Sequence, residues 1–143
     1  MAREIPRVLK TFTETFTPAG LDVFMTTFTP DATYLDPNYS APVPVATAKE
    51  AWVGLFTGFP DMTIKTVGLD AISERVWVWR WVLRGTHTGS FRGIPPTGRS
   101  MAMPGCEFIE LRGDRVCRDV GYFDRLTMLV PLGYALTPAK PPA

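Results

Sequence analysis

The sequence of 143 residues contains one histidine, which lies in a segment built largely from glycine, threonine and proline. His87 belongs to residues 85–99, whose sequence is GTHTGSFRGIPPTGR. An imidazole changes its protonation near neutral pH, so it can move a proton in a reaction. At the end of a predicted strand, His87 is either a structural hydrogen-bonding group or a residue that takes part in catalysis or contacts a ligand. A single histidine excludes mechanisms that need two.

Asp124 stands where a strand pattern ends and a helical pattern begins. Aspartate is favoured at the N-cap of a helix, so one interpretation is a helix cap. The other is a general acid/base at the mouth of an apolar pocket, where the surroundings would raise the pKa of the carboxyl toward neutrality. Both interpretations stay open at this point.

A tight hairpin is predicted around Gly113-Asp114, which suits a two-residue turn. If the turn pairs Arg112 with Arg115, the register follows: Leu111 opposes Val116, Ile109 opposes Arg118, Glu107 opposes Val120 and Met103 opposes Asp124. Cross-strand partners share a face of the sheet. One face is then mostly apolar but carries two carboxylates, as expected of a pocket lining; it holds Met103, Glu107, Ile109, Leu111, Val116, Val120, Tyr122 and Asp124. A bulge at Pro104 is the alternative, and it would shift the pairing beyond it.

Glu107 on an apolar strand face predicts a partner, because buried glutamates are uncommon unless they are paired. Arg80, on a neighbouring predicted strand, is the candidate. A structural ion pair is one interpretation of Glu107, and contact with a substrate is the other.

Three tryptophans alternate on one side of the predicted strand that contains Arg80. They could form part of the core, a subunit contact or a platform for an aromatic ligand: Trp77, Trp79 and Trp81. Which side of this strand faces the pocket is open.

No metal and no cofactor is predicted. Cys106 and Cys117 lack the spacing of metal ligands, and one histidine cannot complete a zinc site with them. On the predicted register these two cysteines are about 13 Å apart, which is too far for a disulfide. The glycines of residues 85–99 do not follow the dinucleotide-binding fingerprint.

The elements that must position these residues put helices first and strands last. Apolar residues at helical spacing predict helices within residues 5–16, 21–28 and 52–59, and residues 47–50 form a capping box before the third. Extended patterns cover residues 33–36, 62–69, 75–87, 100–112 and 115–124, and a last helical turn follows them. Helices that cover one face of a curved antiparallel sheet make an α+β domain. We expect a single domain over residues 1–136 and a flexible, proline-rich tail over 137–143.

Composition limits the partners. Fifteen basic and fourteen acidic residues give a formal net charge of +1, so no electrostatic feature favours nucleic acid or an anionic membrane. Hydrophobic residues make up 45% and charged residues 20% of the chain, which suits a packed core. No signal or transmembrane segment is apparent, and we expect a cytoplasmic protein.

Taken together, several segments resemble the SnoaL-like polyketide cyclases. They are RWVLR followed by GTHTGSFRGIPPTGR, the Phe59-Pro60-Asp61 motif after the third helix, and YFDRLTMLVPLG near the end; the likeness covers about residues 21–133. The resemblance implies a cone-shaped fold shared with nuclear transport factor two and ketosteroid isomerase, a deep apolar cavity and a homodimer. It also implies intramolecular aldol ring closure without metal or cofactor, with an acidic residue at the end of the last strand as general acid/base. Asp124 matches that place, and either His87 or Glu107 stands for the family's active-site histidine.

The expected function is therefore cofactor-free acid–base catalysis on a small hydrophobic carbonyl compound. Asp124 would take a proton from carbon and return one to the developing alkoxide, and His87 or Arg80 would stabilise the enolate oxygen. The substrate cavity would be shaped by Tyr34, Trp52, Met103 and Tyr122, with Glu107 beside them. One alternative is an isomerase, a dehydratase or an epoxide hydrolase, the last needing a cluster of Asp36, Arg80 and Asp124. The other alternative is a non-catalytic binder of a hydrophobic ligand, and fold alone does not decide among these.

Overall fold

The computed structural model describes residues 3–143, and within this range six strands form one sheet in the order β2-β1-β6-β5-β4-β3. The last four strands in the chain are antiparallel neighbours: β3 (Thr63–Ala71), β4 (Val76–Thr86), β5 (Ser100–Arg112) and β6 (Arg115–Phe123). These bounds lie within two residues of those predicted, and the tight turn at Gly113-Asp114 is confirmed, with Gly113 at φ 63°. The predicted α+β class is therefore confirmed.

The sheet is not wholly antiparallel. β1 (Phe28–Leu35) runs parallel to β6, whereas the short β2 (Val43–Pro44) is antiparallel to β1. One helix and four strands separate β1 from β6 along the chain, so no tight turn forces these two strands to run in opposite directions. The sequence predicted a wholly antiparallel sheet, which is wrong for this one pair.

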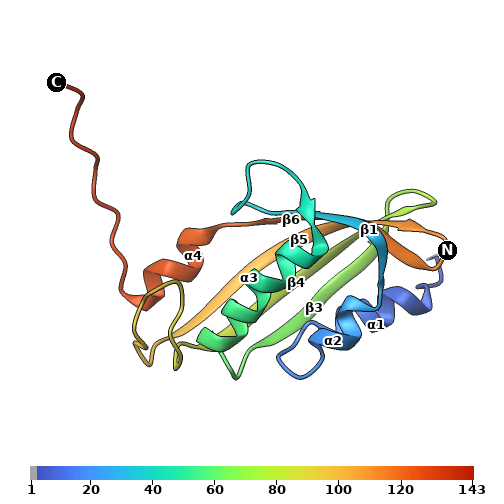
Figure 1. Cartoon of the computed structure of the whole chain (residues 1–143), viewed down its shortest axis with the longest axis horizontal. Helices are drawn as coiled ribbons and strands as arrows, with labels where there is room; N and C mark the ends of the chain where they lie inside the picture. The colour runs from blue at the N-terminus through green and yellow to red at the C-terminus, as the bar shows by residue number, and fades with distance from the viewer. Residues whose placement is uncertain (1–2) are drawn as a thin grey trace.

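The helices lie over one face of the curved sheet (Figure 1). α3 (Val45–Gly58) crosses the middle of the sheet, and α1 (Arg7–Thr15) and α2 (Leu21–Met25) cover the end near the N-terminus. At the opposite end, α4 (Arg125–Leu129) lies beside the loop that connects β4 to β5, and a short 3-10 helix, Val130–Leu132, follows it. Residues 134–143 form neither helix nor strand and extend away from the sheet.

Two helix predictions need correction. α2 ends at Met25, because Phe28 already belongs to β1 and pairs with Val116. α3 begins at Val45 directly after Pro44, so the predicted capping box at residues 47–50 lies inside the helix and no side chain caps its N-terminus.

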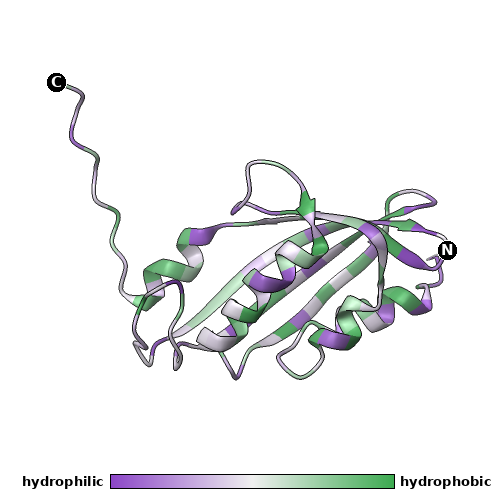
Figure 2. Ribbon diagram, in the orientation of Figure 1, coloured by the Kyte–Doolittle hydropathy of each residue, from purple (hydrophilic) through white to green (hydrophobic). Residues whose placement is uncertain are grey.

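An aromatic core fills the space between helices and sheet. Trp77 and Trp79 point inward from β4 and are 1% exposed, and hydropathy alternates along the long strands (Figure 2). Phe12 of α1 packs against Phe24 of α2 with ring centroids 4.6 Å apart, and against Trp79 at 5.7 Å. The tryptophan side of β4 is thus the inner side, which answers the question that the sequence left open.

A bulge in the last hairpin decides which side chains of β6 face inward. Leu111 pairs with Val116 as predicted, but Glu110 pairs with Arg118, so Cys117 is an extra residue in β6. Beyond this bulge the register is shifted by one, and such a shift moves every side chain of the strand to the other face. Ile109 therefore pairs with Asp119 and Glu107 with Gly121, rather than with Arg118 and Val120. β5 pairs with β4 without a shift through Pro104, and its pairing with β6 ends at Gly105, so the bulge found lies at Cys117 and not at Pro104.

Candidate functional site

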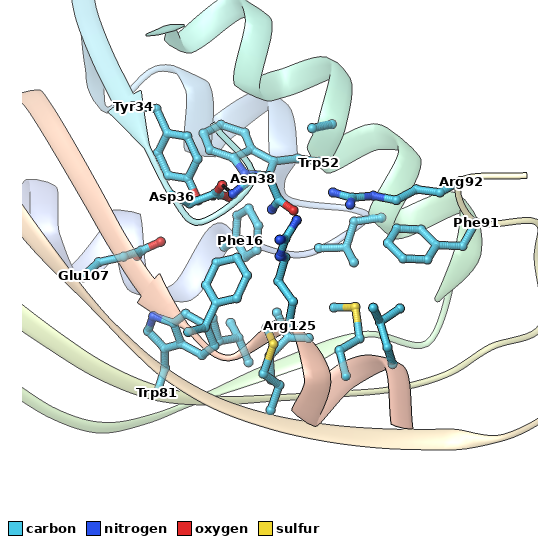
Figure 3. A pocket seen from close by; sticks show the side chains of 18 residues that line it. Phe16, Tyr34, Asp36, Asn38, Trp52, Trp81, Phe91, Arg92, Glu107 and Arg125 are labelled. Carbon is cyan, nitrogen blue, oxygen red and sulfur yellow. Dashed lines mark hydrogen bonds between the residues drawn. The ribbon is translucent and has the colours of Figure 1, made fainter. Parts of the chain in front are cut away.

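A cavity opens between the sheet, α3, α4 and the loop after β4 (Figure 3). The empty space between its side chains is about 750 Å³ when the open mouth is included, and about 90 Å³ of it is available to the centres of water-sized molecules. That interior would hold several waters or a small planar ligand. Five of the candidate site residues that the sequence analysis named line this cavity: Tyr34, Asp36, Trp52, Met103 and Glu107.

The first polar group of the cavity is a hydrogen-bonded pair at the end of β1. The Tyr34 hydroxyl donates to Asp36 Oδ2 at 2.9 Å, and the backbone N–H of Asn38 donates to Asp36 Oδ1 at 2.7 Å. Burial raises the pKa of Tyr34 well above 10, and the negative charges of Glu107, Asp119 and Asp36 add to this effect. Tyr34 therefore remains a donor that holds the Asp36 carboxylate in place.

Glu107 reaches the cavity from β5, and its Oε2 is buried without a hydrogen-bond partner. Burial, together with the charge of Asp36, raises the pKa of Glu107 from 4.5 to about 8. Gly121 lies opposite Glu107, and a Cβ atom there would be 3.5 Å from both the Tyr34 hydroxyl and the Glu107 Cγ. The missing side chain at Gly121 thus leaves Tyr34 and Glu107 facing the same small space. A carboxyl in this setting exchanges its proton near neutral pH.

Asp119 lies deeper than Glu107, and the sequence analysis did not identify it. It is fully buried between Ile109 of β5 and Tyr34 of β1, and neither of its carboxylate oxygens has a hydrogen-bond partner. Burial raises the pKa of Asp119 well above its ordinary range, and the charges of Glu107 and Asp36 add to this. Unpaired buried carboxylates are costly, which is why such groups mark functional sites more often than structural ones.

Trp81 supplies an unused donor on the same wall. Its side chain is 3% exposed and lines the cavity, and its indole Nε1 is buried without an acceptor. In Figure 3 this nitrogen lies on the side of the ring that faces Glu107. Gly105 lets the indole lie flat on β5, because a Cβ at that position would be 2.4 Å from the ring. Buried N–H groups without partners are rare in folded proteins.

The prediction that Asp124 projects into the cavity is wrong. Its side chain is exposed and caps α4, accepting from the Leu126 backbone N–H at 2.9 Å and from the Thr127 hydroxyl at 3.2 Å. The register shift at Cys117 explains this orientation, because it turns Asp124 and Tyr122 away from the inner face. The helix-cap interpretation is the one that the geometry supports.

His87 does not line the cavity either. It is fully buried, stacks on Phe59 with ring centroids 5.3 Å apart, and shares a hydrogen bond between Nδ1 and the Thr97 hydroxyl at 3.0 Å. Its backbone donates to Arg99 and accepts from Gly98. These contacts hold the two ends of the loop after β4 together, so the structural interpretation of His87 fits its surroundings.

Arg80 and Tyr122 lie on the outer face of the sheet. Arg80 is exposed and pairs with Asp70 at 3.5 Å, and Tyr122 is 57% exposed and packs edge-on against Phe108. The predicted ion pair between Arg80 and Glu107 is therefore wrong, because these side chains point to opposite faces. The cluster of Asp36, Arg80 and Asp124 that an epoxide hydrolase would need does not form.

Two arginines at the mouth were also missed. Arg92, in the loop after β4, and Arg125, at the start of α4, both line the cavity. The sequence offered one signal for each, since Arg92 belongs to the segment of residues 85–99 and Arg125 directly follows Asp124. Among residues 3–143 no helix is long and apolar enough to cross a membrane, and no three acidic, histidine or cysteine side chains are arranged to hold a metal ion.

Comparisons with known proteins agree with this architecture. The model of the SnoaL-like polyketide cyclase family matches residues 7–132, whereas no protein of curated function matches the sequence. The solved structure of IdmH from Streptomyces antibioticus, a proposed polyketide cyclase, is similar with 27% identity and a TM-score of 0.76, over 89% of this chain and 96% of IdmH. A proposed polyketide cyclase from Acidithiobacillus ferrooxidans is similar with 26% identity and a TM-score of 0.72, over 87% and 91% of the two chains.

AclR from Streptomyces galilaeus, a proposed hydroxylase, has a TM-score of 0.81 at 20% identity, over 93% of this chain and 83% of AclR. At that identity the likeness concerns the fold alone. The cone-shaped fold of nuclear transport factor two, expected from the resemblance, is confirmed. Since the family model spans most of its length, the chain belongs to the SnoaL-like polyketide cyclase family.

Proposed function

We propose that this protein is a cofactor-free acid–base enzyme that closes a ring of a hydrophobic, polyketide-like carbonyl compound by intramolecular aldol addition. The observation that carries the proposal is the position of Glu107: its carboxyl lies at the inner end of an apolar cavity, and its pKa is raised to about 8 by burial and by Asp36. A carboxylate with a pKa in this range is a much stronger base than an exposed one, and it still exchanges its proton at neutral pH. Family membership supports the reaction class.

In the proposed reaction, ionised Glu107 removes a proton from the carbon between two carbonyl groups. The resulting enolate carbon attacks the carbon of a third, more distant carbonyl group of the same molecule, so one carbon–carbon bond forms and the π electrons of that C=O bond move to its oxygen, which becomes an alkoxide. Protonated Glu107 then returns its proton to the alkoxide, so the reaction needs no further reactant. The cavity contributes by holding the two reacting carbons close together.

Stabilisation of the enolate oxygen, which the sequence analysis assigned to His87 or Arg80, is carried out by another group in this proposal. The buried Nε1–H of Trp81 has no acceptor and faces Glu107, so it suits the enolate oxygen. A donor fixed in a site of low polarity stabilises developing negative charge without having to reorganise. Tyr34 holds Asp36, and the charge of Asp36 keeps the pKa of Glu107 high. Asp119 adds a second buried acidic group beneath them.

The test is to incubate the protein with aromatic compounds that carry a 1,3-dicarbonyl side chain and, within reach of it, a separate carbonyl group, and to analyse the products by chromatography and mass spectrometry. Aldol ring closure or isomerisation leaves the mass unchanged, dehydration lowers it by one water, and hydrolysis raises it by one water. Glu107→Gln should lower turnover by about 10²- to 10⁴-fold. Asp124→Asn is the matched control at the residue that caps α4. Full turnover by Glu107→Gln, with Asp124→Asn inactive, would contradict the proposal.

A homodimer is part of the same proposal. Phe108 and Tyr122, 39% and 57% exposed, pack against each other on the outer face of the sheet and offer an apolar area for a second copy of the chain. Light scattering should give the mass of a dimer, and Tyr122→Glu should give that of a monomer. A monomeric wild-type protein would contradict this part.

The cytoplasmic location expected from the sequence stays a prediction.

A further inference from the structure

We propose that Arg92 and Arg125 form a site for a carboxylate group of the substrate at the mouth of the cavity. The inference rests on the proposed function, because it assumes that the cavity is the substrate site, and it specifies the substrate class: an apolar body with an anionic group at the end opposite the reacting carbonyls.

Both arginines line the cavity, and they come from different elements. Arg92 extends inward from the loop after β4, and Arg125 extends from the start of α4 (Figure 3). In this view both guanidinium groups point toward the side chain of Asn38, whose Oδ1 is buried without a hydrogen-bond partner. Three polar side chains from three segments thus line the same cavity, most of whose other lining residues are apolar.

Neither guanidinium is neutralised. Across residues 3–143 the ion pairs within 4.0 Å involve other basic residues, namely Lys49, Arg80, Arg112 and Arg118. Two like charges at one mouth repel each other, and a bound carboxylate would remove this repulsion. Guanidinium groups suit a carboxylate because their N–H donors match its two oxygens.

The backbone of Arg92 supports a positioning role. Arg92 and Gly93 form a two-residue turn in which Phe91 and Ile94 exchange backbone hydrogen bonds of 3.0 and 2.8 Å. Arg92 has φ 52°, a left-handed conformation that is unfavourable for a residue with a side chain. The turn places the Arg92 guanidinium carbon 5.3 Å from the centre of the Phe91 ring, which is itself part of the cavity wall. Strain of this kind persists where the surrounding structure fixes the residue.

Charge is therefore divided along the cavity. Glu107 lies at the inner end, and Asp119 is buried in the sheet beyond the lining. Asp36 is bonded to the backbone of Asn38, between Glu107 and the two arginines at the mouth. This polarity orients an anionic substrate, because the reverse orientation would bring its carboxylate to the acidic end. The carbonyl groups would then enter first and reach Glu107 and Trp81.

The experiment compares two unreactive probes with the same apolar body, naphthalene-2-carboxylate and naphthalene-2-carboxamide. Binding is measured by the fluorescence of Trp52 and Trp81, which line the cavity, and by calorimetry. Wild-type protein should bind the carboxylate about tenfold or more tightly than the carboxamide. The double variant Arg92→Gln/Arg125→Gln should bind both probes equally, with its affinity for the carboxamide unchanged.

Arg84→Gln is the matched control, because Arg84 is an exposed arginine on the outer face of β4 and should leave the preference intact. Equal binding of the two probes by wild-type protein, or a preference that survives in the double variant, would overturn the proposal. The probes undergo no reaction, so this result is independent of turnover. Glu107→Gln should keep the carboxylate preference while it loses turnover, which separates the failure of one proposal from that of the other.

Discussion

Ile109 and Asp119 lie directly opposite each other across the last hairpin. The pairing is one residue away from the one that a regular hairpin around Gly113-Asp114 would produce, because Cys117 is an extra residue in β6. It turns the Asp119 carboxylate onto the inner face, where Glu107 already lies two residues along β5 from Ile109. The burial of Asp119 beside Glu107 therefore depends on a single bulge.

The first prediction concerns stability and pH. The raised pKa values of Glu107 and Asp119 mean that the folded protein binds more protons than the unfolded chain above pH 4.5. The free energy of unfolding should therefore fall as pH rises from about 5 to 8, by up to about 1.4 kcal/mol per pH unit for each group. Urea denaturation at several pH values measures this. Glu107→Gln should flatten the curve, and a wild-type stability that rises over this interval would contradict the assignment.

A second prediction concerns the pH profile of turnover. If ionised Glu107 is the base, kcat/KM should rise with pH and level off above about pH 8. Asp36→Asn removes the negative charge that helps to raise the pKa of Glu107, so the midpoint of the profile should move to lower pH. Asp22→Asn is the control, because Asp22 pairs with Lys49 at the surface. An unchanged midpoint in Asp36→Asn would remove the charge of Asp36 from the mechanism.

We expect Asp119 to lower the free energy of unfolding while it supports turnover. Both of its oxygens are buried without partners, so Asp119→Val, which replaces the carboxyl by an apolar group of similar size, should raise the free energy of unfolding by about 1–3 kcal/mol at pH 8. If Asp119 serves the site, turnover should fall in the same variant. Denaturation and kinetics on one preparation separate the two effects. A variant that is less stable than wild type would show that Asp119 has a partner.

Asp124 should matter for α4 and not for chemistry. Asp124→Ala removes two hydrogen bonds at the start of that helix and should cost about 1 kcal/mol of stability. Asp124→Asn keeps a cap and should be almost neutral. Turnover should be close to wild type for both variants when measured well below their unfolding temperatures. A loss of turnover by several orders of magnitude in the folded Asn variant would restore the catalytic role that the sequence suggested.

Gly105 tests the placement of Trp81. A methyl group at position 105 would lie 2.4 Å from the indole ring, so Gly105→Ala should displace Trp81 and destabilise the protein by about 1–3 kcal/mol. The matched control is Gly54→Ala in α3, where nothing lies within 4 Å and alanine should stabilise by about 0.5–1 kcal/mol. Near-ultraviolet circular dichroism reports the tryptophan environment. Equal effects of the two substitutions would mean that the ring is free to move.

Local pattern was enough to predict much of this protein. Alternation of apolar and polar residues gave β3 to β6 within two residues, and Gly113-Asp114 gave the hairpin between β5 and β6, because these features depend on neighbours in the chain. The cavity walls that follow from them were predicted as well, since Tyr34, Trp52 and Met103 occupy inward positions of their own elements. Glu107 was identified for the same reason, as a carboxylate on an apolar face.

The sequence could not predict which side chains of β6 point toward the inner face of the sheet. A bulge has no strong local sequence signal, yet it moves every following side chain of β6 to the opposite face of the sheet. Asp119 therefore lies in the core, and Asp124 lies outside it. The mouth of the cavity was equally hidden, since Arg92 and Arg125 meet only when a loop and a helix from distant parts of the chain pack together. The family, the strands and the aromatic walls could be predicted from the sequence, because they follow from local motifs and from the spacing of nearby residues. The set of charged groups that share the cavity could not, because it depends on the pairing of strands and on the packing of segments that are far apart in the chain.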